Sequence, residues 1–267
     1  MGTLYLIPDP ERLWESAALA EDFGACFEYN GFYDPDVLDD PEECERRINL
    51  YKTLGRERSR DTLHGAFYSI AVESEDPLIR RISEKRVRQS MDAARALGVR
   101  GVVFHTGTIP NFRNAEYREV WLKRNRLFWQ EICREYPETE ILMENMFDME
   151  PGFLLALAAE MAEDTNFGIC LDYAHAQVFG GDPVKWLAET APYVRHMHIN
   201  DNNGLEDQHL AVGDGVIDWE TYDRCVRGAG IAPSVLVETR SLERQGRSIK
   251  FMQERGIYPF PKGESRC

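Results

Sequence analysis

The sequence predicts a single (β/α)8 barrel domain built from residues 1–267. Short apolar or β-branched runs alternate with longer amphipathic stretches, and the alternation occurs eight times along the chain. With 43% apolar residues, a chain of 267 residues can build one large core, and this length is typical of an eightfold barrel. We therefore expect one domain without an internal linker.

Each expected strand is a short apolar run that is followed by a helix-like segment. In chain order the expected strands are Thr3–Ile7, Cys26–Asn30, Asp61–Phe67, Gly101–Thr106, Glu140–Met146, Phe167–Tyr173, Val194–Asn200 and Ser234–Arg240. Eight such units in sequence are what a closed parallel barrel requires.

Helix starts are marked by a recurring Asp-Pro pair, because Asp accepts hydrogen bonds from free amides and Pro suits the first helical position. These pairs are Asp9-Pro10, Asp40-Pro41, Asp76-Pro77 and Asp182-Pro183. Helix ends are expected where a glycine can take a left-handed cap, at Gly55, Gly98, Gly230 and Gly256. Residues 257–267, rich in Pro, Gly and charge, are expected to form a loosely held C-terminal extension.

The charge balance restricts the partners of the chain. Lys and Arg total 31 against 46 Asp and Glu, which gives a net charge of −15, so nucleic acid and membrane surfaces are not expected partners. The densest basic stretch, residues 113–126, is interleaved with Glu116 and Glu119 and is interpreted as a solvated helix face. The six cysteines are scattered and no apolar run reaches the roughly 20 residues that span a bilayer, so we expect a cytoplasmic enzyme.

Histidines and acidic residues gather at the C-terminal ends of the expected strands. In a barrel of this type functional groups collect there, and residues two apart on a strand share the inward face. We therefore expect one pocket to be lined by His64, His105, Glu144, Asp172, His175, His198, Asp207, His209 and Glu238.

The carboxylates in this set point to a metal. Glu144 and Glu238 each end an otherwise apolar strand, and burying such a charge without a partner costs several kcal/mol. Facing Asp172 and His198, they imply a divalent cation such as Mn²⁺, Zn²⁺, Co²⁺ or Mg²⁺. Any single histidine in the set is as commonly a packed core residue as a ligand. His196 and Cys170 are expected one layer deeper, as a structural residue and a buried free thiol.

These motifs resemble the xylose isomerase-like TIM-barrel superfamily, which holds sugar isomerases and epimerases, inosose dehydratase-like lyases and the endonuclease IV group. The resemblance runs from Asp61 to Arg240; His198-Ile199-Asn200-Asp201 is similar to the HxxD motif of the superfamily and Asp172-Tyr173-Ala174-His175 to its DxxH element. In the isomerase branch the resemblance implies one metal ion held by Glu144, Asp172, His198 and Glu238. In the endonuclease IV branch it implies three zinc ions held by all nine residues of the pocket.

The charge of the chain and its loop motifs favour the isomerase branch. A chain at −15 is poorly suited to gripping duplex DNA. The Asp207-x-His209 pair followed by Gly213-Asp214-Gly215 also resembles isomerase-like proteins that have no repair role. One ion is therefore expected, with a number of up to three left open. A ketose 3-epimerase is disfavoured, because Gly204 stands where those enzymes carry an Arg.

The resemblance thus implies a metal-dependent isomerase or epimerase of a sugar, sugar phosphate or polyol. Glu144 and Glu238 would transfer a proton through a metal-stabilised enediolate. The small carbohydrate-like substrate is expected to contact His105, His175, Arg240 and Glu28. Arg240 is predicted to share the face of Glu238, with a surface salt bridge as its alternative role, and Glu28 could instead pair with an Arg at the mouth. A dehydratase, a three-zinc phosphodiesterase or AP endonuclease, and a barrel that binds without turnover are the alternatives, and a homo-oligomer stays open.

Overall fold

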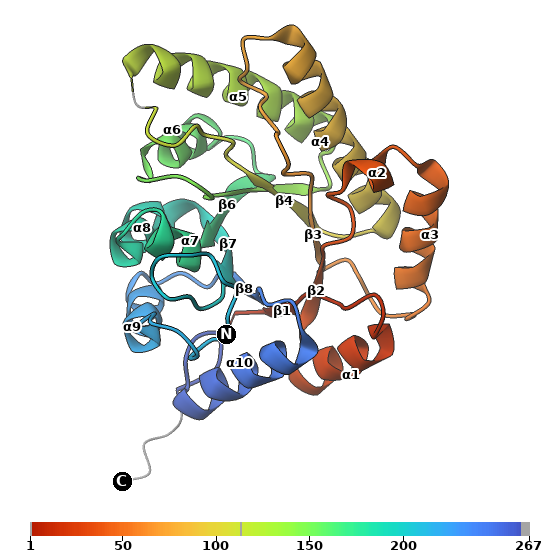
Figure 1. Ribbon diagram of the computed structural model, residues 1–267, viewed down its shortest axis with the longest axis vertical. Helices are drawn as coiled ribbons and strands as arrows, with labels where there is room; N and C mark the ends of the chain where they lie inside the picture. Colours follow the sequence, from red (N-terminus) through yellow and green to blue (C-terminus); the bar gives the residue numbers. More distant parts are fainter. Residues whose placement is uncertain (1, 113, 263–267) are drawn as a thin grey trace.

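Eight parallel strands close into a barrel in which each strand pairs with its neighbours in sequence and the last pairs with the first (Figure 1). The computed structural model describes residues 2–112 and 114–262. The strands are β1 Leu4–Leu6, β2 Cys26–Tyr29, β3 Thr62–His64, β4 Gly101–His105, β5 Glu140–Glu144, β6 Phe167–Asp172, β7 Val194–Ile199 and β8 Ser234–Val237. The predicted barrel and all of its expected strands are confirmed, although the strands are shorter than expected.

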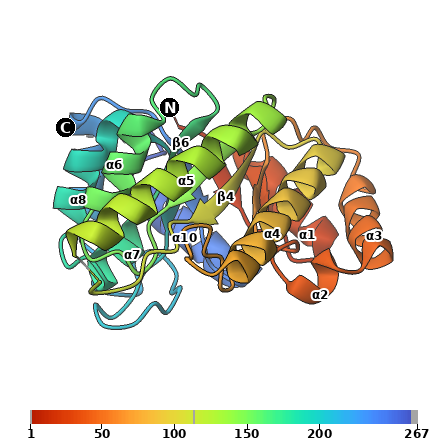
Figure 2. The ribbon, with the colours of Figure 1, turned by 90° about the horizontal axis from the view of Figure 1, so that it is seen from above.

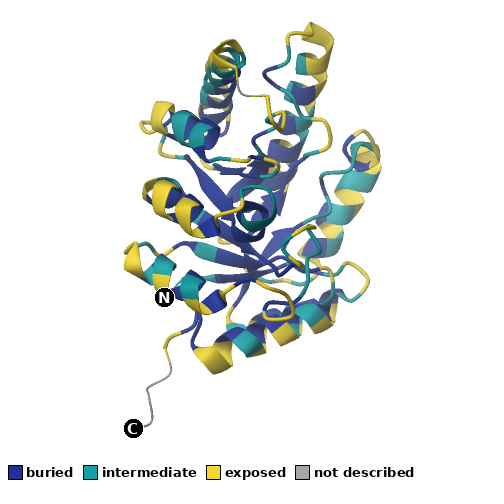
Figure 3. Cartoon of the chain, turned by 60° about the vertical axis from the view of Figure 1, so that its left-hand side comes forward, coloured by how far each residue is buried: buried dark blue, intermediate teal, exposed yellow. Residues whose placement is uncertain are grey.

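Helices surround the barrel on its outer side, as Figures 1 and 2 show from two directions. They are α1 Leu13–Phe23, α2 Pro35–Leu38, α3 Pro41–Lys52, α4 Pro77–Leu97, α5 Ala115–Glu135, α6 Gly152–Glu160, α7 Tyr173–Val178, α8 Pro183–Thr190, the 3-10 turn η1 Ala191–Tyr193, α9 Trp219–Gly228 and α10 Leu242–Arg255. Figure 3 shows the buried strands at the centre and the exposed outer faces of the helices.

Three of the four Asp-Pro pairs cap helices as predicted. Asp40, Asp76 and Asp182 accept hydrogen bonds from the first-turn amides of α3, α4 and α8. The prediction for Asp9 was wrong, because α1 begins at Leu13 after Arg12 and has no side-chain cap. The Asp9 carboxylate instead accepts a hydrogen bond from the Glu11 amide within a preceding turn.

The helix ends agree with expectation at two of the four glycines. Gly98 and Gly256 cap α4 and α10 with φ of 75° and 60°, values that a residue with a Cβ rarely adopts. Gly55 and Gly230 also have positive φ but are not the caps of α3 and α9.

Successive side chains of a strand point alternately into the barrel and out toward the helices, and we call this alternation strand parity. It divides the barrel into two environments. Outward side chains such as Phe27, Val102 and Ile141 join the large apolar cluster, which lies between strands and helices. The inward side chains form two small apolar clusters, one with Tyr5 and Leu236 and one with Val103, Leu142 and Cys170. The remaining inward positions near the strand C-termini are polar, and they make the candidate site.

The start of the C-terminal segment is packed and not loose, which corrects the expectation for its first residues. Tyr258 and Phe260 are buried, and the Tyr258 hydroxyl donates to the Pro233 carbonyl at 2.6 Å. Arg227 donates to the Phe260 carbonyl at 2.6 Å. Buried apolar side chains thus hold residues 257–260 against the barrel domain, although the Pro, Gly and charge content of residues 257–267 predicted a loosely held extension. Residues 263–267 lie outside the described residues.

The cysteines and the basic stretch lie mostly within the described residues. There, Cys26, Cys44, Cys133, Cys170 and Cys225 are all free, while Cys267 lies outside. The basic stretch lies on α5, where Arg118 pairs with Glu150 at 2.9 Å; Arg113 is not among the described residues. Within residues 2–112 and 114–262, every helix is too short or too polar to cross a membrane.

Candidate metal centre

The inward carboxylates and imidazoles converge at the C-terminal mouth of the barrel. Four of the expected residues form what we call the central group: Glu144, Asp172, His198 and Glu238. Each offers one ligand atom, and these atoms all lie within 4.8 Å of one another. His198 Nδ1 lies 3.2 Å from Glu144 Oε1 and 3.4 Å from Glu238 Oε2. All four residues are buried, so the central group is screened from water.

A second set, the β3–β4 group, consists of His64, His105 and Glu144. The Nε2 atoms of His64 and His105 lie 3.5 Å and 3.3 Å from Glu144 Oε2. Oε1 of the same carboxylate faces His198. Glu144 is therefore shared between two groups, with one oxygen directed at each.

A third set, the loop group, consists of His175, Asp207 and His209. Asp207 Oδ2 lies 3.5 Å from His175 Nε2 and 3.0 Å from His209 Nε2. His175 Nδ1 lies 3.5 Å from Glu144 Oε1, which makes the loop group continuous with the central one. All nine residues expected at the mouth thus meet in one site.

Backbone carbonyls fix the orientation of three of the imidazole rings. Nδ1–H of His64 donates to the Gly65 carbonyl at 3.0 Å, that of His175 to Asn145 at 2.9 Å, and that of His209 to Glu238 at 2.9 Å. Only a protonated nitrogen can donate to a carbonyl, so Nδ1 of each ring carries a proton and Nε2 is the nitrogen left to face the site. Metal-ligating histidines are typically held in this way.

Several buried polar atoms of the site have no hydrogen-bond partner among the described residues. They include both Glu144 carboxylate oxygens, Asp172 Oδ2, His175 Nε2 and Glu238 Oε2. Buried polar groups are normally paired, and buried charges are normally paired or bound to metal. Carboxylate oxygens and imidazole nitrogens suit Zn²⁺, Mn²⁺ and Co²⁺. The residues present therefore fit divalent cations.

The pKa shifts in the site arise because acidic and imidazole groups are packed together away from water. Burial raises the pKa of Asp172, and the nearby carboxylates of Glu238 and Glu144 raise it further. Burial alone would also raise the pKa of Glu144, but the imidazoles of His198 and His105 bring it well below its ordinary value. Opposed shifts of this kind are typical of functional sites.

Beneath the central group lies a further layer of polar side chains. Glu28 lies 3.2 Å from His198 Nε2 and 3.3 Å from His196 Nε2, and it accepts a hydrogen bond from the Thr62 hydroxyl at 2.8 Å. Glu28 therefore pairs with two histidines, and His198 separates it from the mouth of the barrel. Both expectations for Glu28, contact with the substrate and pairing with an arginine, are corrected by this position. Its carboxylate orients the ring nitrogen of His198 that faces away from Glu144.

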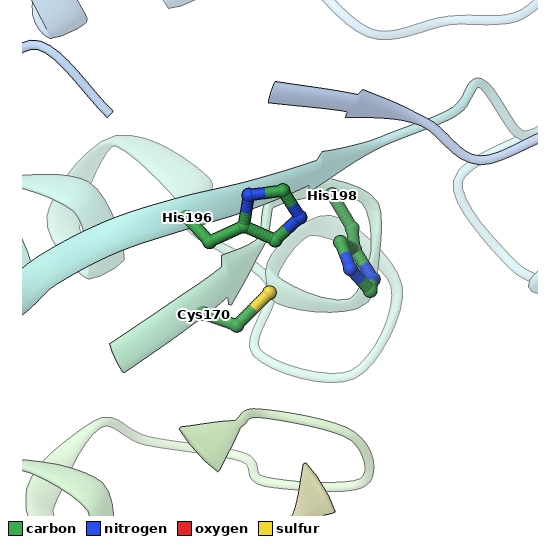
Figure 4. A group of neighbouring side chains, drawn as sticks. All are labelled: Cys170, His196 and His198. Carbon is green, nitrogen blue, oxygen red and sulfur yellow. The ribbon is translucent and has the colours of Figure 1, made fainter. Parts of the chain in front are cut away.

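Cys170 and His196 share this layer, as Figure 4 shows with the sulfur atom beside both rings of β7. His196 Nδ1 lies 2.6 Å from the Ser234 hydroxyl, and its Nε2 lies 3.3 Å from Glu28, so both ring nitrogens face groups inside the barrel. Burial raises the pKa of the Cys170 thiol well above its ordinary value, which disfavours the thiolate that binds metal. The structure places both residues where parity predicted, in the layer below the mouth.

Arg240 does not share the face of Glu238. β8 ends at Val237, and the chain turns there because the Thr239 amide donates to the Val237 carbonyl at 3.0 Å. Arg240 is exposed, and no ion pair to it is found among the described residues. Strand parity fails here because it holds only while the backbone is extended.

Sequence reasoning missed the supporting roles of Asn145 and Asp201. The Asn145 side chain accepts a hydrogen bond from the Asp172 amide at 2.9 Å and donates to the Asp172 carbonyl at 3.0 Å, joining the ends of β5 and β6. Asp201 is fully buried and organises the loop that carries Asp207 and His209. The signals that could have found them are a polar residue directly after β5, for Asn145, and the last position of the HxxD motif, for Asp201.

Comparisons with known proteins agree with this fold. The family model described as xylose isomerase-like TIM barrel matches residues 17–255. A protein of Mycobacterium leprae named Probable endonuclease 4 is 28% identical over 200 residues, which cover 70% of this chain and 76% of that protein.

Two solved structures have a similar fold over nearly the whole chain. The TTHB071 protein from Thermus thermophilus, in a structure described as soaking with ZnCl2, is 26% identical with a TM-score of 0.74 and covers 94% of this chain and 96% of that one. A D-tagatose 3-epimerase-like protein is 21% identical with a TM-score of 0.73, covers 95% of this chain and 96% of that one, and shows the fold alone.

Proposed function

The chain belongs to the xylose isomerase-like TIM-barrel family, and we propose that it hydrolyses a phosphoester of a small molecule at a centre of three divalent metal ions. One observation carries the proposal: Glu144 is shared between the central and the β3–β4 groups, and the loop group adjoins both. Three adjoining sets of three or four candidate ligands would hold one cation each in this proposal.

The charge of the site depends on how many cations it holds. Its nine residues include four carboxylates, Glu144, Asp172, Asp207 and Glu238. One divalent ion leaves the site negative, which suits a neutral sugar. Three divalent ions outweigh the carboxylates and make the site positive, which suits an anion such as a phosphoester. The complete loop group therefore favours an anionic substrate.

The residues of the chain have defined tasks in this proposal. The carboxylates hold the ions, and the carbonyl-bonded histidines present Nε2 in fixed orientations, so little reorganisation accompanies binding. When bound, the ions would offset the charge of a phosphoryl group and make a water molecule acidic enough to attack it near neutral pH. Barrel walls and the buried histidines exclude other water from the cluster.

A small substrate is favoured over nucleic acid. The relative named Probable endonuclease 4 supports hydrolytic chemistry. A net charge of −15, however, opposes association with a polyanion, whose binding depends on many basic contacts. A single phosphoester needs only the local positive charge of the filled metal centre.

Metal content and hydrolysis of a generic diester test the proposal. The purified protein should bind about three zinc or manganese ions per chain and hydrolyse bis(4-nitrophenyl) phosphate. Asp207→Asn should remove one ion and lower kcat/KM by roughly 100-fold, because a carboxamide is a weak ligand. Asp214→Asn, an exposed residue of the same loop that pairs with Arg247, is the matched control and should change neither. One ion per chain with full retention of activity in Asp207→Asn would overturn the proposal.

An isomerase, epimerase or dehydratase acting on a carbohydrate is the second candidate. It is favoured by the central group, which is by itself a complete four-residue ligand set with two glutamates. Against it stands the enclosure of Glu144, whose oxygens lie within 3.5 Å of four imidazoles and are poorly placed to reach a substrate C–H bond. Solvent deuterium incorporation into a ketose that is lost in Glu238→Gln but unaffected by Asp207→Asn would favour this candidate.

A further inference from the structure

A cleft of about 750 Å³ adjoins the β3–β4 group. It lies between the segments that follow β3, β4 and β5, and its walls include the first turns of α4 and α5. His105 lines the cleft and also belongs to the metal centre. A molecule held at the ions could therefore extend directly into the cleft.

The cleft wall is rich in large apolar side chains that the fold leaves exposed. Ile79, Ile109, Phe112 and Phe147 each expose between 45% and 54% of their surface, and all line the cleft. Exposed apolar side chains that gather in one concave place are typical of ligand sites. The wall is suited to a flat or apolar group.

Glu73 places one buried carboxyl group in this wall. Its residue is 6% exposed, and Oε2 has no hydrogen-bond partner among the described residues. Arg124 donates to the Glu73 backbone carbonyl at 2.5 Å and not to the carboxyl group, so Oε2 is left for another partner. Burial raises the pKa of Glu73 to about 7. A cation or N–H donor in the cleft would stabilise its ionised form.

The backbone beside Glu73 keeps the space near its carboxyl group open. Gly107 has φ of 65°, and a Cβ there would lie 4.0 Å from Glu73 Oε2 and 2.7 Å from the Ile70 carbonyl oxygen. Glu75 and Glu116 also line the cleft and add negative charge. The cleft therefore repels a phosphate and attracts donors.

We infer that this cleft is the specificity pocket of the enzyme and binds an aromatic ester group that carries an N–H donor, directed at Glu73. The inference rests on the proposed function for the position of the phosphoester, which sits at the metal centre beside His105. The ester group packs against the apolar wall while Glu73 accepts its N–H hydrogen bond. The substrate is thus a phosphoester whose organic part is aromatic and basic or amide-like.

Equilibrium binding tests the cleft separately from catalysis. The probe is benzamidine, an aromatic ring with paired N–H donors and no phosphate, titrated calorimetrically into the holoprotein at pH 8. Glu73→Gln should weaken benzamidine binding at least about tenfold, because the charge-assisted hydrogen bonds are lost. Glu119→Gln, an exposed glutamate on α5 outside the cleft lining, is the matched charge control and should bind as the parent does. Val120→Trp, which fills the cleft from α5, should abolish binding while circular dichroism stays unchanged.

Kinetics then connect the cleft to the phosphoester site. Three 4-nitrophenyl phosphodiesters with the same leaving group are compared, whose second ester group is methyl, phenyl or 4-(aminomethyl)phenyl. KM should fall at least about tenfold from methyl to phenyl through apolar burial, and further with the amine, and only the last gain should disappear in Glu73→Gln.

Different results would overturn the proposed hydrolase and the proposed specificity pocket. Benzamidine binding that depends on Glu73, without hydrolysis of any diester, would retain the binding cleft and remove the proposed hydrolase. Hydrolysis with equal KM for all three diesters and benzamidine binding that is unchanged in Glu73→Gln and Val120→Trp would overturn the cleft inference and leave the hydrolase standing.

Discussion

Asp201 is the residue whose replacement tests most directly how the third part of the metal centre is built. Its buried carboxylate accepts four hydrogen bonds: Oδ1 from the amides of Asn202 at 2.9 Å and Ile217 at 3.2 Å, and Oδ2 from the Gly213 amide at 2.9 Å and the Trp219 indole at 2.8 Å. These donors come from both ends of the β7–α9 loop. We predict that Asp201→Asn destabilises the fold and releases one metal ion.

The magnitude follows from the hydrogen bonds. An asparagine can present its carbonyl oxygen to only one pair of donors, and its NH2 group would then face the other pair. A hydrogen bond to a charged acceptor contributes roughly 1.5–3 kcal/mol, so losing two should lower the free energy of unfolding by about 3–6 kcal/mol. Asp207 and His209 lie within the same loop, so the loop group should lose its cation.

Urea unfolding of metal-free protein measures the first effect, and metal analysis of reconstituted protein measures the second. Asp214→Asn is the control within the loop. This exposed carboxylate pairs with Arg247, so the substitution should change stability by less than about 1 kcal/mol. The reasoning is refuted if Asp201→Asn unfolds within about 0.5 kcal/mol of the parent and binds the same number of ions.

Three further predictions concern a helix cap, a buried acid and the ions. Asp40→Ala should lower the free energy of unfolding by about 1 kcal/mol, whereas Asp9→Ala should cost less because Asp9 caps no helix; urea titrations of both check this. The pKa of Glu73 is raised by burial from 4.5 to about 7, so its contribution to stability is full below pH 4.5 and is lost as pH rises through 7. The parent should therefore lose up to about 3 kcal/mol relative to Glu73→Gln between pH 4.5 and 7.5, and parallel pH profiles would contradict it. Chelation should lower Tm, since an ion at roughly 100-fold excess over its Kd stabilises the fold by about 3 kcal/mol, and scanning calorimetry with and without chelator measures the loss.

The barrel could be predicted because its signals are local. Inward and outward side chains alternate along each strand, so Leu142 and Glu144 point inward while Ile141 and Met143 join the outer core. Parity needs only an extended backbone. The short helices α2 and α7 were not anticipated as separate elements, because helices of 4 and 6 residues are too short to display a period.

Parity also predicted which residues meet at the mouth but not which of them become partners. Glu28 and His198 both point inward, as expected, yet their contact at 3.2 Å joins β2 to β7 across the barrel. Such a contact depends on the relative stagger of strands that are far apart in the sequence. The chain alone therefore left open whether Glu28 would meet an arginine, a substrate or a histidine.

The number of metal ions depends on the loop that carries Asp207 and His209, where no period applies. The loop folds back so that Asp201 and Leu210 exchange backbone hydrogen bonds of 3.0 Å and 2.8 Å. Next to this bridge His209 has φ of 47°, a left-handed conformation that costs a residue with a Cβ about 1 kcal/mol or more. A glycine would adopt this conformation without the cost but would offer no ring.

The strained position instead holds an imidazole whose Nδ1–H donates to the Glu238 carbonyl and whose Nε2 faces Asp207. The hydrogen bond to Glu238 ties the loop to the residue that follows β8, so the loop and central groups are fixed relative to each other. This arrangement is expected if both groups act on one ligand, and it is the physical reason to favour three cations over one.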